Sequence, residues 1–326
     1  MLFCSKVLYI GSQKTHEQYE RGIVPSHWLY GAVEMEKDGH ELVWEDEKVS
    51  LMNDLNLLRK HKPDMVFIPN LNLHNHLLLL VITAIGISHT PIVAWLHHEP
   101  KVKKGLKAWF YRFLLSGCKH IFFLSEKTME ETVNNGLMDK KKCSVPGWGP
   151  DMDFYDKVEK TDGDYYVSTG KENRDFNILI DAFKRTCAPL KIMTAKSHGG
   201  NNHEWLKERC KDIPNIEVVI TENTGDVYPQ MVKEMAKAKA LVCPLQQDKL
   251  NYCVGLSTVT DAEGLGKPLI ITKNPYHAHK RVADFNVVED VNEWTIAINN
   301  PRKPKTTLFS MCNCWENMKP HIFTLT

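Results

Sequence analysis

Residues 240–272 read ALVCPLQQDKLNYCVGLSTVTDAEGLGKPLIIT, and this stretch decides the fold. Its apolar runs, polar residues and glycines predict a strand, a loop, a helix, a tight turn and a second strand. The predicted helix starts in a Gly-Leu-Ser run at Gly255 and carries Asp261 on its second turn. N–H groups at a helix start bind phosphate, and a nearby carboxylate can bind sugar hydroxyls. The stretch therefore predicts a nucleotide-sugar site near the end of a long α/β chain.

The same alternation of apolar runs and helical patterns extends over the whole chain, which predicts parallel sheets built from βαβ units. The strands expected in the first half are Lys6–Ile10, Glu41–Trp44, Asp64–Ile68, Ile92–Leu96, His120–Leu124 and Cys143–Val145. Those expected in the second half are Asp164–Ser168, Leu190–Thr194, Asn215–Ile220, Ala240–Pro244, Pro268–Thr272 and Phe285–Val288. A Gly- and Pro-containing, charged stretch before Asp164 reads as a linker. Two Rossmann-like domains are therefore expected, over residues 1–155 and 156–305.

Several helices have recognisable signals. Ser26 is expected to cap a helix that ends at Gly39 and has an apolar face made by Trp28, Leu29, Ala32 and Val33. Residues 178–183 and 231–236 show similar apolar stripes, and residues 306–326 form a short amphipathic tail.

Composition limits the class of protein. The chain has 326 residues, 43% of them hydrophobic, and a net charge of +1, which argues against a nucleic-acid partner. Its nine cysteines include no CxxC pair, as expected for a reduced, cytoplasmic protein. The N-terminus lacks the features of a signal peptide, and the longest apolar run, at 77–87, is too short to span a bilayer.

A series of segments carries a resemblance to a known family. They are GIVPSHWLYGAVEMEKDGHEL (22–42), VAWLHHEP (93–100), CSVPGWGPDMDFY (143–155), YVSTGKENRDFNILIDAF (166–183), the stretch at 240–272 and FSMCNCWENMKPHI (309–322). In order and spacing they resemble the retaining GT-B glycosyltransferases of family 4. The resemblance implies two Rossmann-like domains facing a central cleft: an N-terminal acceptor domain and a C-terminal nucleotide-sugar donor domain. It also implies that a closing helix crosses back to the first domain.

The donor segment departs from the family pattern in two places. The family has two glutamates eight residues apart, and these positions hold Cys253 and Asp261 here. Its basic pair appears as Lys171 and Arg174, in swapped order. The resemblance implies a retaining, metal-independent transferase that takes a sugar from a nucleotide-diphosphate sugar, with no other cofactor. The acceptor would be a hydroxyl of a polysaccharide, lipopolysaccharide or lipid-linked glycan.

The departing diphosphate needs fixed positive charge and backbone donors. Lys171 and Arg174 follow Gly170 at the carboxyl end of a predicted strand, where ligands bind in open α/β sheets. They are therefore predicted to bind the diphosphate. The helix start at 255–258 is predicted to bind it as well, through Gly255, Leu256, Ser257 and Thr258. Gly22, in the loop expected after the first strand, is a further candidate to border the phosphate.

The remaining site residues are carboxylates and histidines. Asp261 and Glu263 compete for the ribose role, because two residues apart on a helix they face different ways. Asp261 is preferred, and Glu263 is expected to be exposed or paired with Lys267. His97 and His98 follow an apolar strand, and one of them is expected to lie near the reacting sugar, as the resemblance implies; His97 is preferred.

Metal signals are weak. Asp151 and Asp153 form a DxD pair in the linker, as do Asp162 and Asp164, and Cys312 and Cys314 form a lone CxC. No essential metal is therefore predicted.

Residues 101–120, KVKKGLKAWFYRFLLSGCKH, contain six Lys or Arg, four aromatic rings in a row of five residues, and no acid. One interpretation is a helix that docks on an anionic membrane surface, which would place a cytoplasmic protein peripherally on the inner face of the membrane. The other is a half-buried helix with solvated lysines.

Other functions stay open. A GT-B relative can hydrolyse or epimerise a nucleotide sugar, and Cys253 is compatible with a degenerate protein that binds the donor without turnover. A dehydrogenase is disfavoured, because the segment after the first strand, GSQKTHEQYERG, holds no GxGxxG.

Overall fold

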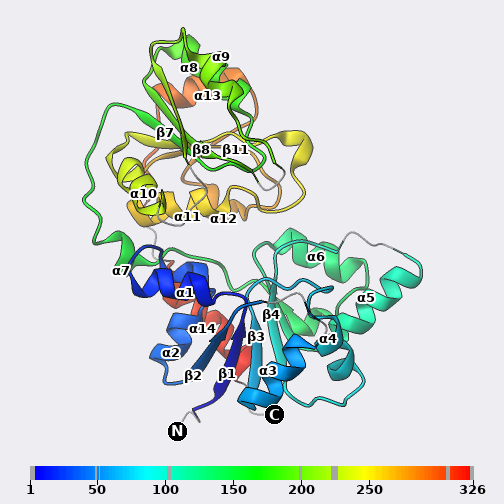
Figure 1. Ribbon diagram of the computed structural model, residues 1–326. Coiled ribbons are helices and arrows are strands. Elements are labelled where there is room, and N and C mark those ends of the chain that lie inside the picture. The colour runs from blue at the N-terminus through cyan, green and yellow to red at the C-terminus, as the bar shows by residue number, and fades with distance from the viewer. Residues whose placement is uncertain are drawn as a thin grey trace. The chain divides into compact units, whose positions relative to one another are not determined.

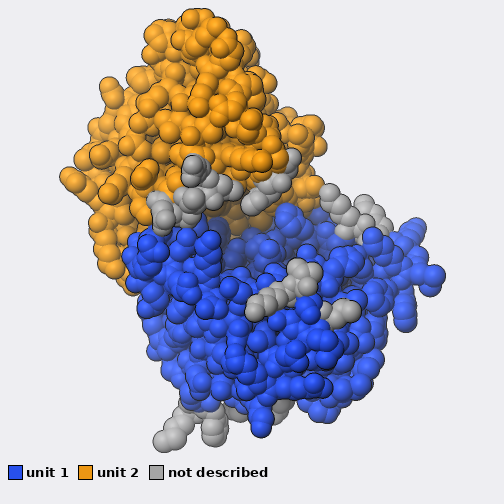
Figure 2. All heavy atoms as spheres, viewed as in Figure 1, with its two compact units in different colours: residues 1–149, 309–326 blue, residues 150–308 orange. Residues whose placement is uncertain are grey.

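The computed structural model describes residues 4–47, 50, 52–100, 104–197, 200–221, 227–305 and 309–323. The chain divides into two compact units, drawn in different colours in Figure 2: unit 1 is residues 1–149 with 309–326, and unit 2 is residues 150–308. Each unit contains a six-stranded parallel sheet with helices on both faces (Figure 1). The predicted α/β architecture with two Rossmann-like domains is confirmed. Residues 150–155, assigned from the sequence to the first domain, belong to unit 2.

Unit 1 has the strand order β2-β1-β3-β4-β5-β6, which is the flavodoxin-like order with one strand added. Its strands are β1 (Lys6–Ile10), β2 (Glu41–Glu45), β3 (Met65–Ile68), β4 (Ile92–Leu96), β5 (Cys118–Phe123) and β6 (Cys143–Ser144). Its α-helices are α1 (Gln13–Glu20), α2 (Ala32–Lys37), α3 (Asn53–His61), α4 (Leu77–Ala84), α5 (Leu106–Ser116), α6 (Glu126–Asn134) and α14 (Met311–Ile322), with 3₁₀ turns at Ser26–Leu29 and Lys140–Lys142.

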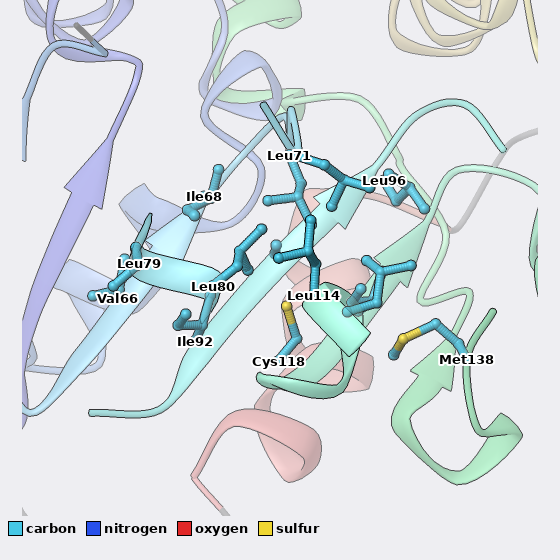
Figure 3. Packing of buried hydrophobic residues seen from close by; sticks show 14 of the residues in the cluster. Val66, Ile68, Leu71, Leu79, Leu80, Ile92, Leu96, Leu114, Cys118 and Met138 are labelled. Carbon is cyan, nitrogen blue, oxygen red and sulfur yellow. The ribbon is translucent and has the colours of Figure 1, made fainter. Parts of the chain in front are cut away.

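One core of unit 1 lies between the sheet and the helices α3 to α6. Strand side chains such as Val66, Ile68 and Ile92 meet Leu80 of α4 and Leu114 of α5 there (Figure 3). These strands are apolar on both faces, as expected for a parallel sheet covered by helices on both sides.

The other face of the unit 1 sheet is covered partly by the last helix, α14. Its buried stripe is Met311, Cys314, Trp315, Met318 and Ile322, the spacing of one helix face. Trp315 Nε1 donates to Asp38 Oδ2 at 2.8 Å, and Lys319 pairs with the same carboxylate. The expected return of the C-terminal helix to the first domain is confirmed.

Unit 2 has the order β12-β11-β10-β7-β8-β9, which in chain order is the dinucleotide-binding arrangement 3-2-1-4-5-6 read from the other edge. Its strands are β7 (Tyr166–Thr169), β8 (Leu190–Ala195), β9 (Ile216–Thr221), β10 (Ala240–Cys243), β11 (Leu269–Thr272) and β12 (Asn286–Val288). Its α-helices are α7 (Met152–Tyr155), α8 (Phe176–Thr186), α9 (Trp205–Cys210), α10 (Tyr228–Lys237), α11 (Leu256–Leu265), α12 (His279–Val282) and α13 (Val291–Asn299), with a 3₁₀ turn at Gln247–Lys249. Among all the helices described in both units, none combines the length and apolar character that crossing a membrane requires.

Every expected strand is present, with ends that shift by up to two residues. The helices expected around 178–183 and 231–236 are α8 and α10. The helix expected from Ser26 to Gly39 is wrong as drawn: a 3₁₀ turn comes first, Tyr30 (φ 52°) and Gly31 (φ 96°) adopt left-handed backbone, and α2 starts at Ala32. Ser26 is the first residue of that turn, and its hydroxyl lies 3.4 Å from Glu34 Oε1. Glycine is favoured at position 31 for two reasons. Its φ is positive, and a Cβ there would lie 3.2 Å from Met318 Sδ.

Helix α1 was not expected, since the segment after β1 reads as a loop. It has no buried residue and hence no apolar stripe for periodicity to reveal.

Candidate functional site

The strand order of unit 2 reverses between β7 and β10, because β8 and β9 continue to one side and β11 and β12 to the other. In open α/β sheets, ligands bind outside the carboxyl ends of the strands at such a switch point. The loop after β7 carries Gly170, Lys171 and Arg174, and the loop after β10 runs into the start of α11. The two segments predicted to bind a diphosphate therefore flank this point.

Backbone hydrogen bonds join these two loops directly. Asp175 N donates to Pro244 O at 3.2 Å, and Gln246 N donates to Asn173 O at 2.9 Å. Between them, Arg174 and Leu245 form an antiparallel bridge. The loop after β7 is thus fixed against the loop after β10.

Arg174 is buried in this arrangement, with 7% of its surface exposed. Its Nη1 donates to Glu172 O at 2.8 Å, while Nε and Nη2 point at Thr169 O at 3.4 Å. A guanidinium has five N–H donors, and within the described part of the chain these contacts use three. Its end lies over Gly170 (φ 102°), where a Cβ would approach Nη2 to 2.4 Å. A fixed positive charge is therefore held at the carboxyl end of β7.

Lys171 is half-buried, and its carbonyl accepts a hydrogen bond from His203 Nε2 at 3.2 Å. That contact fixes the backbone of the loop beside Arg174.

Helix α11 follows the loop after β10, in which Leu245 pairs with Arg174. Gly255 caps it with φ 89°, and a Cβ there would lie 3.2 Å from Cys243 Sγ and 3.3 Å from Leu245. Leu256 is buried, whereas Ser257 is exposed. Thr258 is buried and hydrogen-bonds the thiol of Cys243. Of the two hydroxyls predicted to add to the site, the structure therefore presents that of Ser257 to solvent.

Two residues that the sequence analysis missed fix the segment before α11. Asn274 Nδ2 donates to Tyr252 O at 3.0 Å and to Val254 O at 3.1 Å. His277 Nε2 donates to Val254 O at 2.9 Å, and burial lowers the pKa of His277 to about 4, so the ring is neutral at pH 7. Both residues lie in the loop at the carboxyl end of β11. Their position after a predicted strand was the one sequence signal that could have indicated a place in the site. They hold the helix start in one geometry before any ligand arrives.

Asp261 lies in a buried network of hydroxyls. Tyr155 and Tyr228 both donate to Asp261 Oδ1 at 2.7 Å, and the two hydroxyl oxygens lie 2.9 Å apart. Desolvation raises the pKa of Asp261 to about 6, against the opposing effect of the two hydroxyls. The ribose role stays a prediction, and the structure shows a carboxylate bound to two tyrosines of its own unit.

Glu263 is also buried, and it pairs with Arg281 through both carboxylate oxygens. The expectation that it is exposed or paired with Lys267 is wrong. Lys267 donates instead to Thr161 O and lies 3.5 Å from Asp162. Arg281 lies on α12, and nothing in the spacing of the sequence indicated that the two would meet.

Cys253 stands where the family has its first glutamate. It is buried, and desolvation raises its pKa to about 12, so the thiol stays protonated and unreactive.

Replacing Asp261 with asparagine is expected to remove a pH dependence of stability. The folded pKa of about 6 lies above the ordinary 3.8, so the folded state binds this proton more tightly. The protonated Asp261 makes its full contribution to the free energy of unfolding below pH 4. That contribution, about 3 kcal/mol, is lost as the pH rises through 6. Asn keeps the accepting oxygen without the charge. Urea unfolding between pH 4 and 8 should show a flatter curve and a more stable variant at pH 7.

The exposed Asp181, on α8, supplies the control. Asp181→Asn should leave the shape of the pH curve unchanged. A D261N variant less stable than the wild type at pH 7 would mean that the charge itself stabilises the tyrosine pair.

In unit 1, His97 follows β4 and its ring lies 5.1 Å from that of Tyr30. Burial lowers its pKa to about 4, helped by the charge of His98, and a hydrogen bond to the backbone of Pro69 opposes the shift. Proline has no N–H, so the ring donates to the carbonyl. Nε2 is shielded from solvent and has no hydrogen-bond partner among the described residues, which leaves Nδ1 as the donor. His97 is thus a neutral ring whose Nε2 can accept a proton.

His98 is exposed, so the two histidines face different environments, as strand alternation predicts.

Gly22 is exposed with φ 68° and follows α1, so a whole helix separates it from the end of β1. Gly11 is the glycine that directly follows that strand.

One member of each acidic pair has a structural partner. Asp151 Oδ1 accepts from Phe154 N at 3.1 Å and caps α7, and Asp162 lies near Lys267 and Lys303. Within the described ranges, no three His, Cys, Asp or Glu side chains gather in a group able to hold a metal ion.

Comparison with solved structures finds the same fold over nearly the whole chain. The UDP-GlcNAc 2-epimerase from Neisseria meningitidis, bound to UDP-GlcNAc, matches with a TM-score of 0.57 and 12% identity, over 96% of this chain and 98% of that one. HepE from Anabaena, in complex with UDP, matches with a TM-score of 0.56 and 13% identity, over 97% of this chain and 94% of that one. AviGT4, a glycosyltransferase involved in avilamycin A biosynthesis, matches with a TM-score of 0.56 and 13% identity, over 97% of this chain and 96% of that one.

No protein-family model and no curated protein matches the sequence. At these identities the structural comparisons establish the fold alone. The chain therefore has the two-domain α/β architecture of GT-B proteins.

Proposed function

We propose that this chain is an enzyme that binds a nucleotide-diphosphate sugar, with UDP as the nucleotide, at the switch point of unit 2. One observation carries the proposal: a buried guanidinium and the start of α11 lie on two loops that backbone hydrogen bonds hold together. Both features bind phosphate in proteins. The structures of HepE with UDP and of the Neisseria epimerase with UDP-GlcNAc support the choice of nucleotide.

The arrangement suits cleavage next to a diphosphate. Breaking the bond between the anomeric carbon and the diphosphate leaves negative charge on the leaving group. Arg174 and the N–H groups at the start of α11 are already oriented, so they stabilise that charge without rearranging. Predicted partners on the same edge are Lys171 and Ser257.

The first candidate reaction is glycosyl transfer with retention, to a hydroxyl of a polysaccharide, lipopolysaccharide or lipid-linked glycan. AviGT4 shares the fold and is a glycosyltransferase. His97 would contact the sugar or the attacking hydroxyl through Nε2, in its neutral form. For retention, a donor phosphate oxygen would help to take the acceptor proton, so no pair of catalytic carboxylates is needed.

The second candidate is epimerisation or hydrolysis of the nucleotide sugar, which the comparisons support at least as well, since several of the similar structures are 2-epimerases. Epimerisation at a carbon removes and returns a proton, so it needs a positioned base. Unit 1 carries the exposed carboxylate of Glu47, which accepts a hydrogen bond from Asn75 Nδ2 at 2.6 Å. His76, whose Nε2 lies 3.4 Å from Glu47, is itself bound to Asp54 at 2.9 Å.

Thermal unfolding with a panel of UDP-, GDP-, TDP- and CMP-sugars tests the binding step. At a concentration of about 100 Kd, a ligand that binds only the folded state adds about 2.7 kcal/mol. We expect the UDP-sugars to give the largest increase in Tm. CMP-sugars carry one phosphate instead of two, and we expect them to give the smallest. Equal shifts from the UDP- and CMP-sugars would contradict a diphosphate site.

Product analysis then separates the reactions. Transfer releases UDP only when an acceptor is present, hydrolysis releases it without one, and epimerisation yields an isomeric UDP-sugar. Binding without any of these products would identify a degenerate binding protein.

A further inference from the structure

Helix α5 has two apolar faces. Ala108, Tyr111, Leu114 and Leu115 are buried against the core of unit 1. Leu106, Trp109, Phe110 and Phe113 follow the i, i+3, i+4, i+7 spacing of a second stripe. At about 100° per residue, this second stripe lies on the side of the helix opposite to the buried one.

The second stripe faces solvent. Leu106 is 87% exposed, Trp109 63% and Phe110 37%. Phe113 is half-buried, and its ring stacks on Trp109 with centroids 6.0 Å apart. Three large apolar side chains on adjacent turns of one helix form a contiguous patch, which on a soluble surface marks an interaction site.

Cations border this patch on both sides. Lys107 and Arg112 each lie about 110° around the helix from the centre of the stripe, in opposite directions. Lys104 precedes the helix and is exposed. No acidic residue occurs between Glu99 and Glu126. The surface is therefore an apolar, aromatic strip flanked by positive charge.

We propose that this face of α5 docks unit 1 on an anionic lipid bilayer. Trp109, Phe110 and Leu106 would enter the boundary between headgroups and acyl chains, where aromatic side chains are favoured. Lys104, Lys107 and Arg112 would contact the negatively charged headgroups. A second copy of the chain is a poorer partner, because pairing the two strips would bring like charges together. The inference does not depend on which reaction unit 2 supports.

Vesicle flotation with the full chain tests the proposal. We expect wild-type protein to float with vesicles that contain phosphatidylglycerol, much less with pure phosphatidylcholine, and to be released by high salt. Trp109→Ser combined with Phe110→Ser should lower partitioning by at least about tenfold, since it removes two apolar anchors. Lys107→Glu should lower binding to the anionic vesicles and leave the weak binding to phosphatidylcholine unchanged.

A matched control is available in unit 2. Trp205 is 40% exposed and Ile296 is 69% exposed, so Trp205→Ser with Ile296→Ser removes a comparable surface elsewhere. This control should float like the wild type. Equal flotation of the W109S/F110S variant and the wild type would overturn the proposal, as would wild-type protein that ignores anionic vesicles. A wild type that dimerises through Trp109 without binding lipid would overturn it too.

The outcome stays separate from that of the nucleotide site. A variant that loses vesicle binding should keep its stabilisation by UDP-sugar in vesicle-free buffer.

Discussion

Replacing Arg174 with alanine is expected to weaken binding of a UDP-sugar by about two to four orders of magnitude. Hydrogen bonds to charged groups contribute about 1.5–3 kcal/mol each, and a guanidinium can give a diphosphate two of them. The side chain is buried and held by Thr169 and Glu172 carbonyls, so its position is set before the ligand binds. Isothermal titration with UDP would measure the loss directly.

Two further variants make the result specific. Arg185, on α8, is exposed and bonds Asn292 Oδ1 at 2.9 Å, away from the switch point, so Arg185→Ala should bind UDP normally. Arg174→Lys keeps a charge but loses the two-pronged geometry, and it should recover only part of the affinity. Unaltered UDP binding by a folded R174A protein would remove Arg174 from the site and with it the main support for the proposed function.

Replacing Trp315 with alanine is expected to lower the free energy of unfolding of unit 1 by about 3–5 kcal/mol, the usual cost of truncating a buried Trp. The indole is 3% exposed, donates to Asp38 and lies against Gly31. The variant should unfold at lower urea when followed by circular dichroism. The increase in Tm that UDP-sugar gives should persist, because Trp315 belongs to unit 1 and the predicted donor site to unit 2.

Trp109→Ala serves as its control, since that indole is 63% exposed. It should change stability by no more than about 0.5 kcal/mol. If W315A proved as stable as W109A, α14 would contribute little to unit 1, and the buried stripe described above would have no energetic meaning.

The strands were predictable because each is a short apolar run between turn residues, and in a parallel sheet covered on both faces such runs need no alternation. The helix start at Gly255 was predictable for a related reason, since its Gly-Leu-Ser run follows a strand. Helix α1 was not, because it buries nothing. The break at Tyr30 and Gly31 was not either, and Gly31 lies against Met318, which is far away in the sequence.

The partners of Asp261 and Glu263 could not be predicted from the sequence either, because they lie on other elements of the fold. Asp261 meets Tyr155 across 106 positions, and Glu263 meets Arg281 across 18. A helical register can say that two carboxylates face different ways. It cannot say which hydroxyl or guanidinium will be there, because that depends on how distant elements pack.

The place of α14 in unit 1 has a consequence for biosynthesis. Residues 309–323 are translated after all of unit 2, yet they cover Gly31 and bond to the carbonyls of Pro146 and Gly147. On the ribosome, the first sheet therefore emerges with part of one face uncovered, and more than a hundred residues are added before α14 can cover it. Unit 2 is one continuous segment, so it can complete its folding before α14 has been made. Unit 1 begins the chain, yet its folding is completed last.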